Sequence, residues 1–95
     1  MHIYLVEAEH FEVPGMIRRA FTRKADAEAF ANETANQILK DACEVADASF
    51  EPLPVDATQA QRDNAIDGQI AAIGYECNAY ADVIDMELEG RLPLE

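Results

Sequence analysis

The sequence is poor in several residue types that support known classes of small protein. Among 95 residues there is no tryptophan, and only two cysteines and seven basic residues occur. Cys43 and Cys77 lie far apart, whereas disulfide-rich mini-domains hold more cysteines and zinc sites use close pairs such as C-x-x-C. We expect two free thiols in or near the core and no metal site, with a bridge between the two cysteines as the alternative.

Long apolar runs and catalytic motifs are also absent. The longest uncharged apolar stretch falls far short of the roughly 20 residues that cross a bilayer. Glu7, Glu9 and Glu12 stand where a signal peptide would carry its apolar segment. No nucleophile motif, P-loop or dinucleotide fingerprint occurs. The sequence therefore predicts a cytoplasmic, non-enzymatic protein that needs no cofactor and contacts no membrane.

Negative charge is what the sequence has in excess. Nineteen acidic and seven basic residues give a formal net charge of -12. Residues 1–24 hold three acids and four bases, whereas residues 25–95 hold sixteen acids and three bases. Charge at this density disfavours direct binding of nucleic acids and anionic membranes, and it favours association with basic surfaces.

Apolar residues make up 49% of the chain, which is enough for one modest core and too many for a disordered protein. We therefore expect a single domain that spans residues 1–95. The large side chains predicted to form its core are Phe21, Phe30, Ile38, Leu39, Ile66, Ile70, Ile73, Ile84 and Leu88.

The N-terminal segment predicts a β-hairpin. Residues 2–7 are rich in strand formers and carry apolar side chains on both sides, which is typical of a central strand. Residues 12–15, Glu-Val-Pro-Gly, are typical of a turn. Residues 16–21 then predict a second strand that returns along the first.

Residues 23–45 predict a long helix. The Thr22 hydroxyl is expected to act as its N-cap, and Asp26 and Glu28 suit the positive end of the helix dipole. Apolar residues recur at spacings of three and four, so they form one stripe along the helix. The residues of this stripe are Ala27, Phe30, Thr34, Ile38, Ala42 and Val45.

The next segment predicts an ordered connector and a second helix. Residues 49–55 contain Pro52 and Pro54, which exclude a regular helix or a central strand. Asp56 is expected to cap the second helix, and Gly74 is expected to end it in a left-handed C-cap. The apolar face of this helix is formed by Ile66, Ile70 and Ile73.

Two structures fit residues 75–89. Apolar residues continue the helical spacing past Gly74, but from Tyr80 onward apolar and acidic residues alternate with a period of two, which favours a third strand. We therefore predict an α+β fold of order ββααβ, in which two helices cover one face of a three-stranded antiparallel sheet. The alternative is a hairpin followed by one long C-terminal helix.

The closing segment supplies the candidate partner-binding residues, Asp82, Asp85, Glu87 and Glu89. In a strand the last three form a row on the solvent face, with a repeat of about 6.6–6.8 Å. Such a row has the scale of a nucleic-acid backbone and would suit a protein that binds nucleic acids. The plainer interpretation is a solvated face, or an edge strand charged against aggregation.

Two other charged clusters are expected to be structural. Glu7, Glu9, His10 and Glu12 are interpreted as solvated hairpin residues, because His10 points away from the neighbouring carboxylates in a strand and a metal needs converging ligands. The basic cluster lacks interleaved aromatics and is expected to offset the hairpin carboxylates across the strands. This cluster consists of Arg18, Arg19, Arg23 and Lys24.

The pattern of a hairpin, an alanine-rich helix and an acidic closing strand resembles a loose group of small bacterial and phage proteins. The residues that carry this resemblance are Ile3 to Val6, Ala20 to Thr22, Ala25 to Phe30 and Val83 to Glu89. In size and acidity the chain also resembles phage anti-defence inhibitors, including anti-CRISPR and DNA-mimic proteins. The resemblance implies an inhibitor, and it transfers no catalytic or binding residue.

Two functions follow as hypotheses. The first is an inhibitory binding protein whose acidic surface occupies a basic, nucleic-acid-binding surface of a partner, such as a CRISPR effector complex. The second is a small structural or regulatory module that forms a homodimer and uses its acidity for solubility. Its interface would be apolar, on the open sheet face or around Tyr75 and Tyr80.

Overall fold

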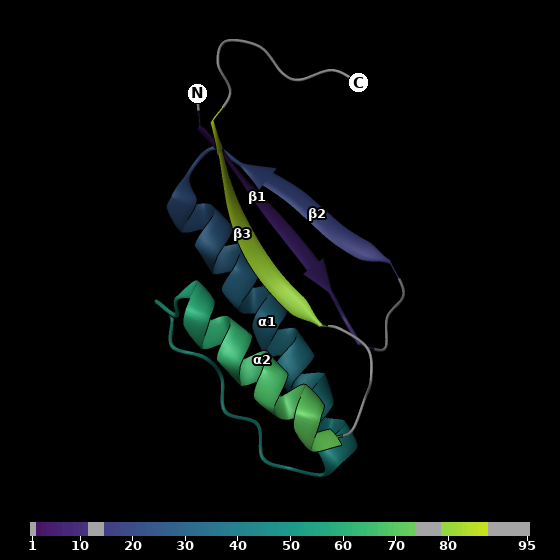
Figure 1. The fold of residues 1–95 in the computed structure, drawn as a ribbon. Helices are drawn as coiled ribbons and strands as arrows, with labels where there is room; N and C mark the ends of the chain where they lie inside the picture. The colour runs from purple at the N-terminus through teal and green to yellow at the C-terminus, as the bar shows by residue number, and fades with distance from the viewer. Residues whose placement is uncertain (1, 12–14, 74–78, 88–95) are drawn as a thin grey trace.

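The computed structural model describes residues 2–11, 15–73 and 79–87 (Figure 1). Its elements in chain order are β1 (His2–Glu9), β2 (Met16–Phe21), α1 (Lys24–Ala46), α2 (Gln59–Ile73) and β3 (Tyr80–Glu87). This order confirms the predicted ββααβ fold. The alternative with one long C-terminal helix is wrong, because β3 pairs along the whole of β1.

The three strands form an antiparallel sheet of order β2-β1-β3, so β1 is central, as its apolar residues on both sides predicted. Val6 pairs with Val83 and Ala8 pairs with Ala81, and these side chains face the helices. Both helices lie on this one side of the sheet (Figure 1). The opposite side of the sheet is called the open face below.

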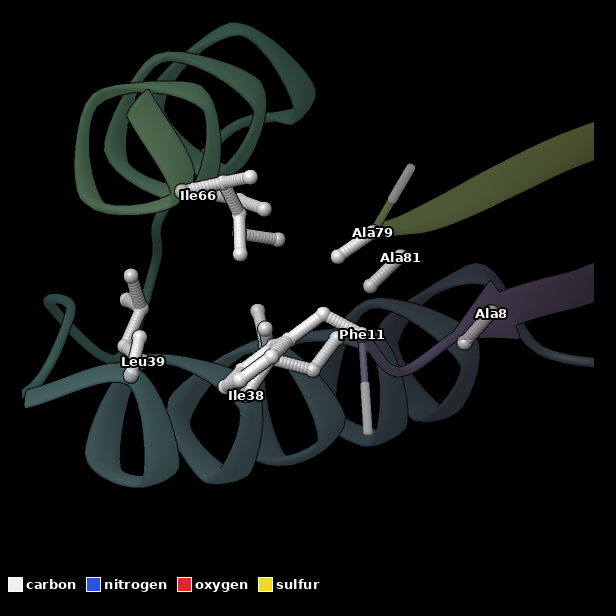
Figure 2. Packing of buried hydrophobic residues seen from close by; sticks show 10 residues of the cluster. Ala8, Phe11, Ile38, Leu39, Ile66, Ala79 and Ala81 are labelled. Carbon is white, nitrogen blue, oxygen red and sulfur yellow. The ribbon is translucent and has the colours of Figure 1, made fainter. Parts of the chain in front are cut away.

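Small side chains let α1 lie close to the sheet. The larger core cluster combines Ala35 and Ala42 of α1 and Ala8 and Ala81 of the strands with bulkier residues. Figure 2 shows Ile66 and Ala81 pointing toward Ile38 and Phe11, which lie between the helices and the sheet. A second cluster joins Val6 to Ala27 and Ala31, with Phe21 and Phe30 partly buried at its edge. The apolar layer between the sheet and the helices thus consists of two clusters.

Of the nine predicted core residues, four are buried, Phe21 and Phe30 are partly buried, and one is exposed. Ile38, Leu39, Ile66 and Ile70 are buried as expected. Ile84 is 37% exposed, because β3 turns its smaller residues Ala81 and Val83 toward the helices instead. The side chain of Ile73 and the whole of Leu88 lie outside the described residues.

The bounds of α1 agree with the prediction to within one residue, but its details differ. Arg23 is the N-cap and makes no capping bond with its side chain, so the predicted cap at Thr22 is wrong. The buried stripe follows the alanines, whereas Val45 is exposed, because the close approach to the sheet selects the smallest side chains. At the C-terminus Asp47 adopts a left-handed conformation with φ 54°, and the Ala48 N–H donates to the Cys43 carbonyl.

A capping box starts α2 two residues later than predicted. The Gln61 N–H donates to the Thr58 hydroxyl (3.2 Å), and the Thr58 N–H donates to the Gln61 side-chain oxygen (2.8 Å). Thr58 therefore caps the helix, and the predicted cap at Asp56 is wrong. The predicted C-cap at Gly74 and the turn at residues 12–14 lie outside the described residues, while Gly15 adopts a positive φ of 100°.

Two smaller predictions concern the thiols and the membrane. Cys43 is a buried free cysteine, and Cys77 lies outside the described residues. Neither described helix is long and apolar enough to span a bilayer.

Candidate functional site

The outer face of α1 carries a row of carboxylates that we call the α1 acidic stripe. It consists of Asp26, Glu33, Glu44 and Asp47, all of them exposed. The spacings of seven and eleven residues are close to two and three helical turns, so Asp26, Glu33 and Glu44 lie on one face of α1, opposite the buried alanines. Asp47 is the C-cap that follows the helix, in a left-handed conformation. At 1.5 Å per residue, Asp26 and Glu44 are about 27 Å apart along the helix axis.

Little positive charge offsets this stripe. Within residues 25–73 and 79–87, Lys40 and Arg62 are the basic residues, and Arg62 is fully buried. Lys40 is therefore the one exposed base of those ranges. Further exposed carboxylates lie in the connector and on α2, at Glu51, Asp56 and Asp67. Beyond the start of α1, where Arg23 and Lys24 are exposed, the helical layer consequently presents a strongly negative surface, and the exposed arginines Arg18 and Arg19 lie on β2.

Arg62 is buried because every part of its guanidinium group is engaged. Nη1 donates to the Glu28 carboxylate and to the Asn32 side-chain oxygen, both at 2.8 Å, and to the Ala57 carbonyl at 3.2 Å. Nη2 donates to the Gln59 side-chain oxygen at 2.8 Å, and Nε donates to the Ala81 carbonyl at 3.3 Å. One side chain thus joins α1, the connector, α2 and β3.

The edge of β3 is closed by Gln59. Its amide nitrogen donates to the Ala81 carbonyl (3.1 Å), and its amide oxygen accepts from the Val83 N–H (3.0 Å). A side-chain amide here takes the place of a neighbouring strand, which satisfies backbone groups that an edge would leave free. The same nitrogen donates to Asp63 and Asp82, each at 2.9 Å.

The predicted partner-binding residues fall into different settings. Asp82 is partly buried in the Gln59 network, where burial and then the Asp63 carboxylate raise its pKa, against the opposing effect of Arg62. Asp85 is exposed and accepts a hydrogen bond from His2 Nδ1 at 3.0 Å. The side chain of Glu87 and the whole of Glu89 lie outside the described residues. Asp82 and Asp85 lie on opposite faces of β3, so these two residues form no common surface. Asp85 lies on the same side of β3 as Ala81 and Val83, and the prediction that it begins a row on the open face is wrong.

The hairpin charges partly follow the prediction. Arg18 Nε lies 3.0 Å from Glu7, the expected pair across the strands. Arg19 instead lies over the rings of Phe21 and Phe30, with its guanidinium carbon 5.2 Å from each ring centre. That position is favourable because the faces of aromatic rings attract cations. Glu12 lies outside the described residues.

His10 is the residue that the sequence interpretation placed wrongly. Its side chain is 10% exposed, with Nε2 hydrogen-bonded to Asp41 of α1 at 2.6 Å and its ring stacked on Phe11. It follows the end of β1 and is pinned to the helix, so it is not a solvated hairpin residue. Among the described residues, no three His, Cys, Asp or Glu side chains converge as a metal site.

The open face carries an apolar patch at one end of the sheet. Ile3 pairs with Met86, and Leu5 pairs with Ile84 across β1 and β3, so these four side chains are neighbours. They are half-buried or exposed, and no described element covers them. We call this group the open-face patch.

A shallow cleft of about 600 Å³ lies between α1 and the connector. The connector is fixed there by two asparagines of α1, because Asn36 accepts from the Leu53 N–H (2.8 Å) and Asn32 donates to the Val55 carbonyl (3.0 Å). Phe50, Leu53 and Val55 line the cleft, and Val55 is 96% exposed. Its lining combines apolar side chains with Glu33 and Lys40 and includes no serine, threonine or cysteine.

Sequence reasoning missed the α1 acidic stripe, although its signal was available. The spacings of seven and eleven residues are visible in the sequence. The partner-binding residues were instead assigned to the closing segment, because acidic residues are denser there. The burial of Arg62 had no comparable signal. Comparisons with models of protein families, with curated proteins and with solved structures gave no match.

Proposed function

We propose that this protein is a non-enzymatic acidic binding protein that occupies a basic, nucleic-acid-binding surface of a partner, in the manner of an anti-defence inhibitor. The observation that carries the proposal is the α1 acidic stripe, with its exposed carboxylates along α1 and at its C-cap. The burial of Arg62 supports it, because it removes one of the few positive charges from the helical surface.

We assign the contact with the partner to α1 rather than to β3. Asp82 is committed to Gln59, and Asp85 is bonded to His2, so each would lose an internal partner on binding. No partner is recorded for the stripe residues Asp26 and Glu33 among the hydrogen bonds and ion pairs of the described residues. Exposed carboxylates of this kind act at long range and guide a basic surface toward the protein.

The spacing of the stripe indicates what kind of mimicry is involved. Duplex DNA carries one charge per about 1.7 Å of its axis, whereas the helical part of the stripe has three carboxylates over about 27 Å. The helix is therefore too sparse to copy a duplex phosphate by phosphate. The stripe resembles a nucleic acid in the negative sign of its charges and in their arrangement along a line. These features suit a long basic groove rather than a site that recognises each phosphate.

The proposal is tested by recovering partners from a bacterial extract on the immobilised protein at low and high salt. We expect basic nucleic-acid-binding proteins to be retained at low salt, to be lost at high salt, and to be displaced by short duplex DNA. Such binding depends on charges that salt screens. Recovery of no basic protein at low salt, or of partners that DNA leaves bound, would contradict the proposal.

Self-association is the second candidate function, and the open-face patch is the observation that favours it. Two copies could bury Ile3, Leu5, Ile84 and Met86 against each other. Sedimentation over a range of protein concentrations tests this candidate, with Ile84→Glu as the variant, because Ile84 is 37% exposed and its replacement leaves the core intact. A dimer that persists in this variant, or a wild-type protein that stays monomeric, would exclude the patch as the interface.

A further inference from the structure

The two edges of the sheet differ in whether side chains bond to their backbone groups. The edge of β3 is closed by Gln59 and Arg62, which bond the Ala81 carbonyl and the Val83 N–H. The edge of β2 has no such cover: Met16 to Ala20 are exposed, and no backbone hydrogen bond outside the β1 pairing reaches β2 from the described residues. An open edge is a template on which another extended chain can pair.

The side chains of β2 give this edge a chemical preference. Met16 and Ile17 are 45% and 44% exposed, and Arg18 and Arg19 follow them directly. Successive strand residues point to opposite faces, so Arg18 lies on the open face near Glu7, and Arg19 lies on the helix face over Phe21 and Phe30. Arg18 contacts Glu7 through Nε and its side chain remains 65% exposed, so a further carboxylate can pair with it while the Glu7 contact is kept. The edge therefore offers one cation on each face of the sheet, next to two apolar side chains.

A second copy of this chain is a poor occupant of the edge. Antiparallel pairing of two β2 strands in any register that uses most of the strand brings the two arginine pairs opposite or next to each other. Like charges directly opposite on neighbouring strands are destabilising. The arginines thus select against self-pairing and for a strand with carboxylates at the facing positions.

We propose that β2 binds an extended acidic segment of a partner protein by strand addition. The added strand carries carboxylates at two consecutive positions, one for Arg18 and one for Arg19, and apolar residues beside Met16 and Ile17. Backbone hydrogen bonds along the edge supply affinity, and the two charge pairs supply specificity. This surface lies on the sheet and is independent of the α1 acidic stripe, so the proposed function and this inference can fail separately.

The test uses the full chain, isotope-labelled for NMR, and a capped peptide of sequence Thr-Val-Glu-Glu-Val-Thr as the probe at physiological salt. We expect chemical-shift changes and slower amide exchange confined to residues 16–21 and the adjoining β1. A peptide with Lys-Lys in place of Glu-Glu should bind about fivefold more weakly or worse. A Glu-Glu peptide N-methylated at every residue should lose binding, because neither of its edges can donate hydrogen bonds to β2.

A variant with Arg18→Gln and Arg19→Gln tests whether the two arginine charges cause the preference for the acidic peptide while the fold is kept. It should keep the circular-dichroism spectrum of the wild type and lose its preference for Glu-Glu over Lys-Lys. Three results would overturn the proposal: no shift changes up to the solubility limit of the Glu-Glu peptide, shift changes centred outside β2, or equal binding of the N-methylated peptide. The last result would mean that charge alone attracts the peptide.

Discussion

Among single residues, Arg62 shows most clearly how a charge can be made part of a small core. A buried cation is costly unless it is paired and fully hydrogen-bonded, and Arg62 meets both conditions through Glu28, Asn32, Gln59 and two backbone carbonyls. Its planar group with five N–H donors suits this arrangement better than the single ammonium of lysine. The residue therefore positions four segments at once.

Replacing Arg62 tests this role. Arg62→Met should lower the free energy of unfolding by about 3 kcal/mol, the low end for a broken buried ion pair, because Glu28 is partly exposed and can regain water. Arg19→Met is the control, since Arg19 is exposed and should cost about 1 kcal/mol or less. Urea unfolding measures both values. Equal losses in the two variants would show that the buried network adds no stability.

Asp82 provides a prediction about pH. Burial and the Asp63 carboxylate raise the pKa of Asp82 in the folded state. The protonated side chain therefore stabilises the fold at pH values below 3.8, the ordinary pKa of this group, and the stabilisation is lost as the pH rises through the folded pKa. At neutral pH, Asp82→Asn keeps an acceptor for Gln59 and removes the charge beside Asp63. We expect the variant to be more stable at pH 7 by less than about 1 kcal/mol.

Urea unfolding at several pH values checks this expectation for Asp82. The advantage of Asp82→Asn should shrink as pH falls toward 3.8. Asp67→Asn, at an exposed position of α2, controls for the general effect of removing one negative charge. A wild-type protein that is more stable than Asp82→Asn at pH 7 would show that the carboxylate strengthens the Gln59 network.

At the scale of elements, the helices and strands were predictable from sequence, and their contacts were not. The period-two alternation after Tyr80 identified β3, but Ala81 and Val83 are also apolar, so the alternation could not show which side meets the helices. The choice depends on how closely α1 approaches the sheet, which its alanines decide. The candidate site shows the same limit, because the burial of Arg62 depends on partners from four segments.

At the start of α2, the predicted cap, Asp56, can be tested against the observed cap, Thr58. Thr58→Ala should lower the free energy of unfolding by about 1 kcal/mol, because it removes the hydroxyl that accepts from the Gln61 N–H. Asp56→Ala should change it by less than about 0.5 kcal/mol, as is usual for exposed positions. Thermal and urea unfolding check both, and a larger loss in Asp56→Ala would contradict the capping box.

The closed edge of β3 has its own prediction. Gln59→Ala removes the acceptor of the Val83 N–H, so amide exchange of Val83 should become faster, while exchange within β1 stays nearly unchanged. The matched control is Gln37→Ala on the exposed face of α1, where the side chain bonds only to Asp41 among described residues. If Val83 exchanges at the same rate in Gln59→Ala and in the wild type, Gln59 does not close this edge.

At the scale of the whole molecule, the surface divides by charge. The helical layer is negative beyond its start, where Arg23 and Lys24 are exposed: over residues 25–73 and 79–87 Lys40 is the one exposed base, whereas β2 carries exposed arginines. The net charge of -12 was evident from composition, but composition could not show that three carboxylates share one face of α1 and that Asp47 follows them. The position of these carboxylates distinguishes a binding surface from acidity that only serves solubility. Solubility depends on the net charge, whereas binding depends on where the charges lie.

The most direct test compares two variants of equal net charge. The first neutralises the α1 acidic stripe by Asp26→Asn, Glu33→Gln, Glu44→Gln and Asp47→Asn. The second neutralises four acidic residues elsewhere by Glu51→Gln, Asp56→Asn, Asp67→Asn and Asp85→Asn. The measurement is the amount of basic protein that each variant retains from a bacterial extract and releases to duplex DNA. We expect the first variant to lose this binding and the second to keep most of it. Equal retention by both variants would contradict this expectation.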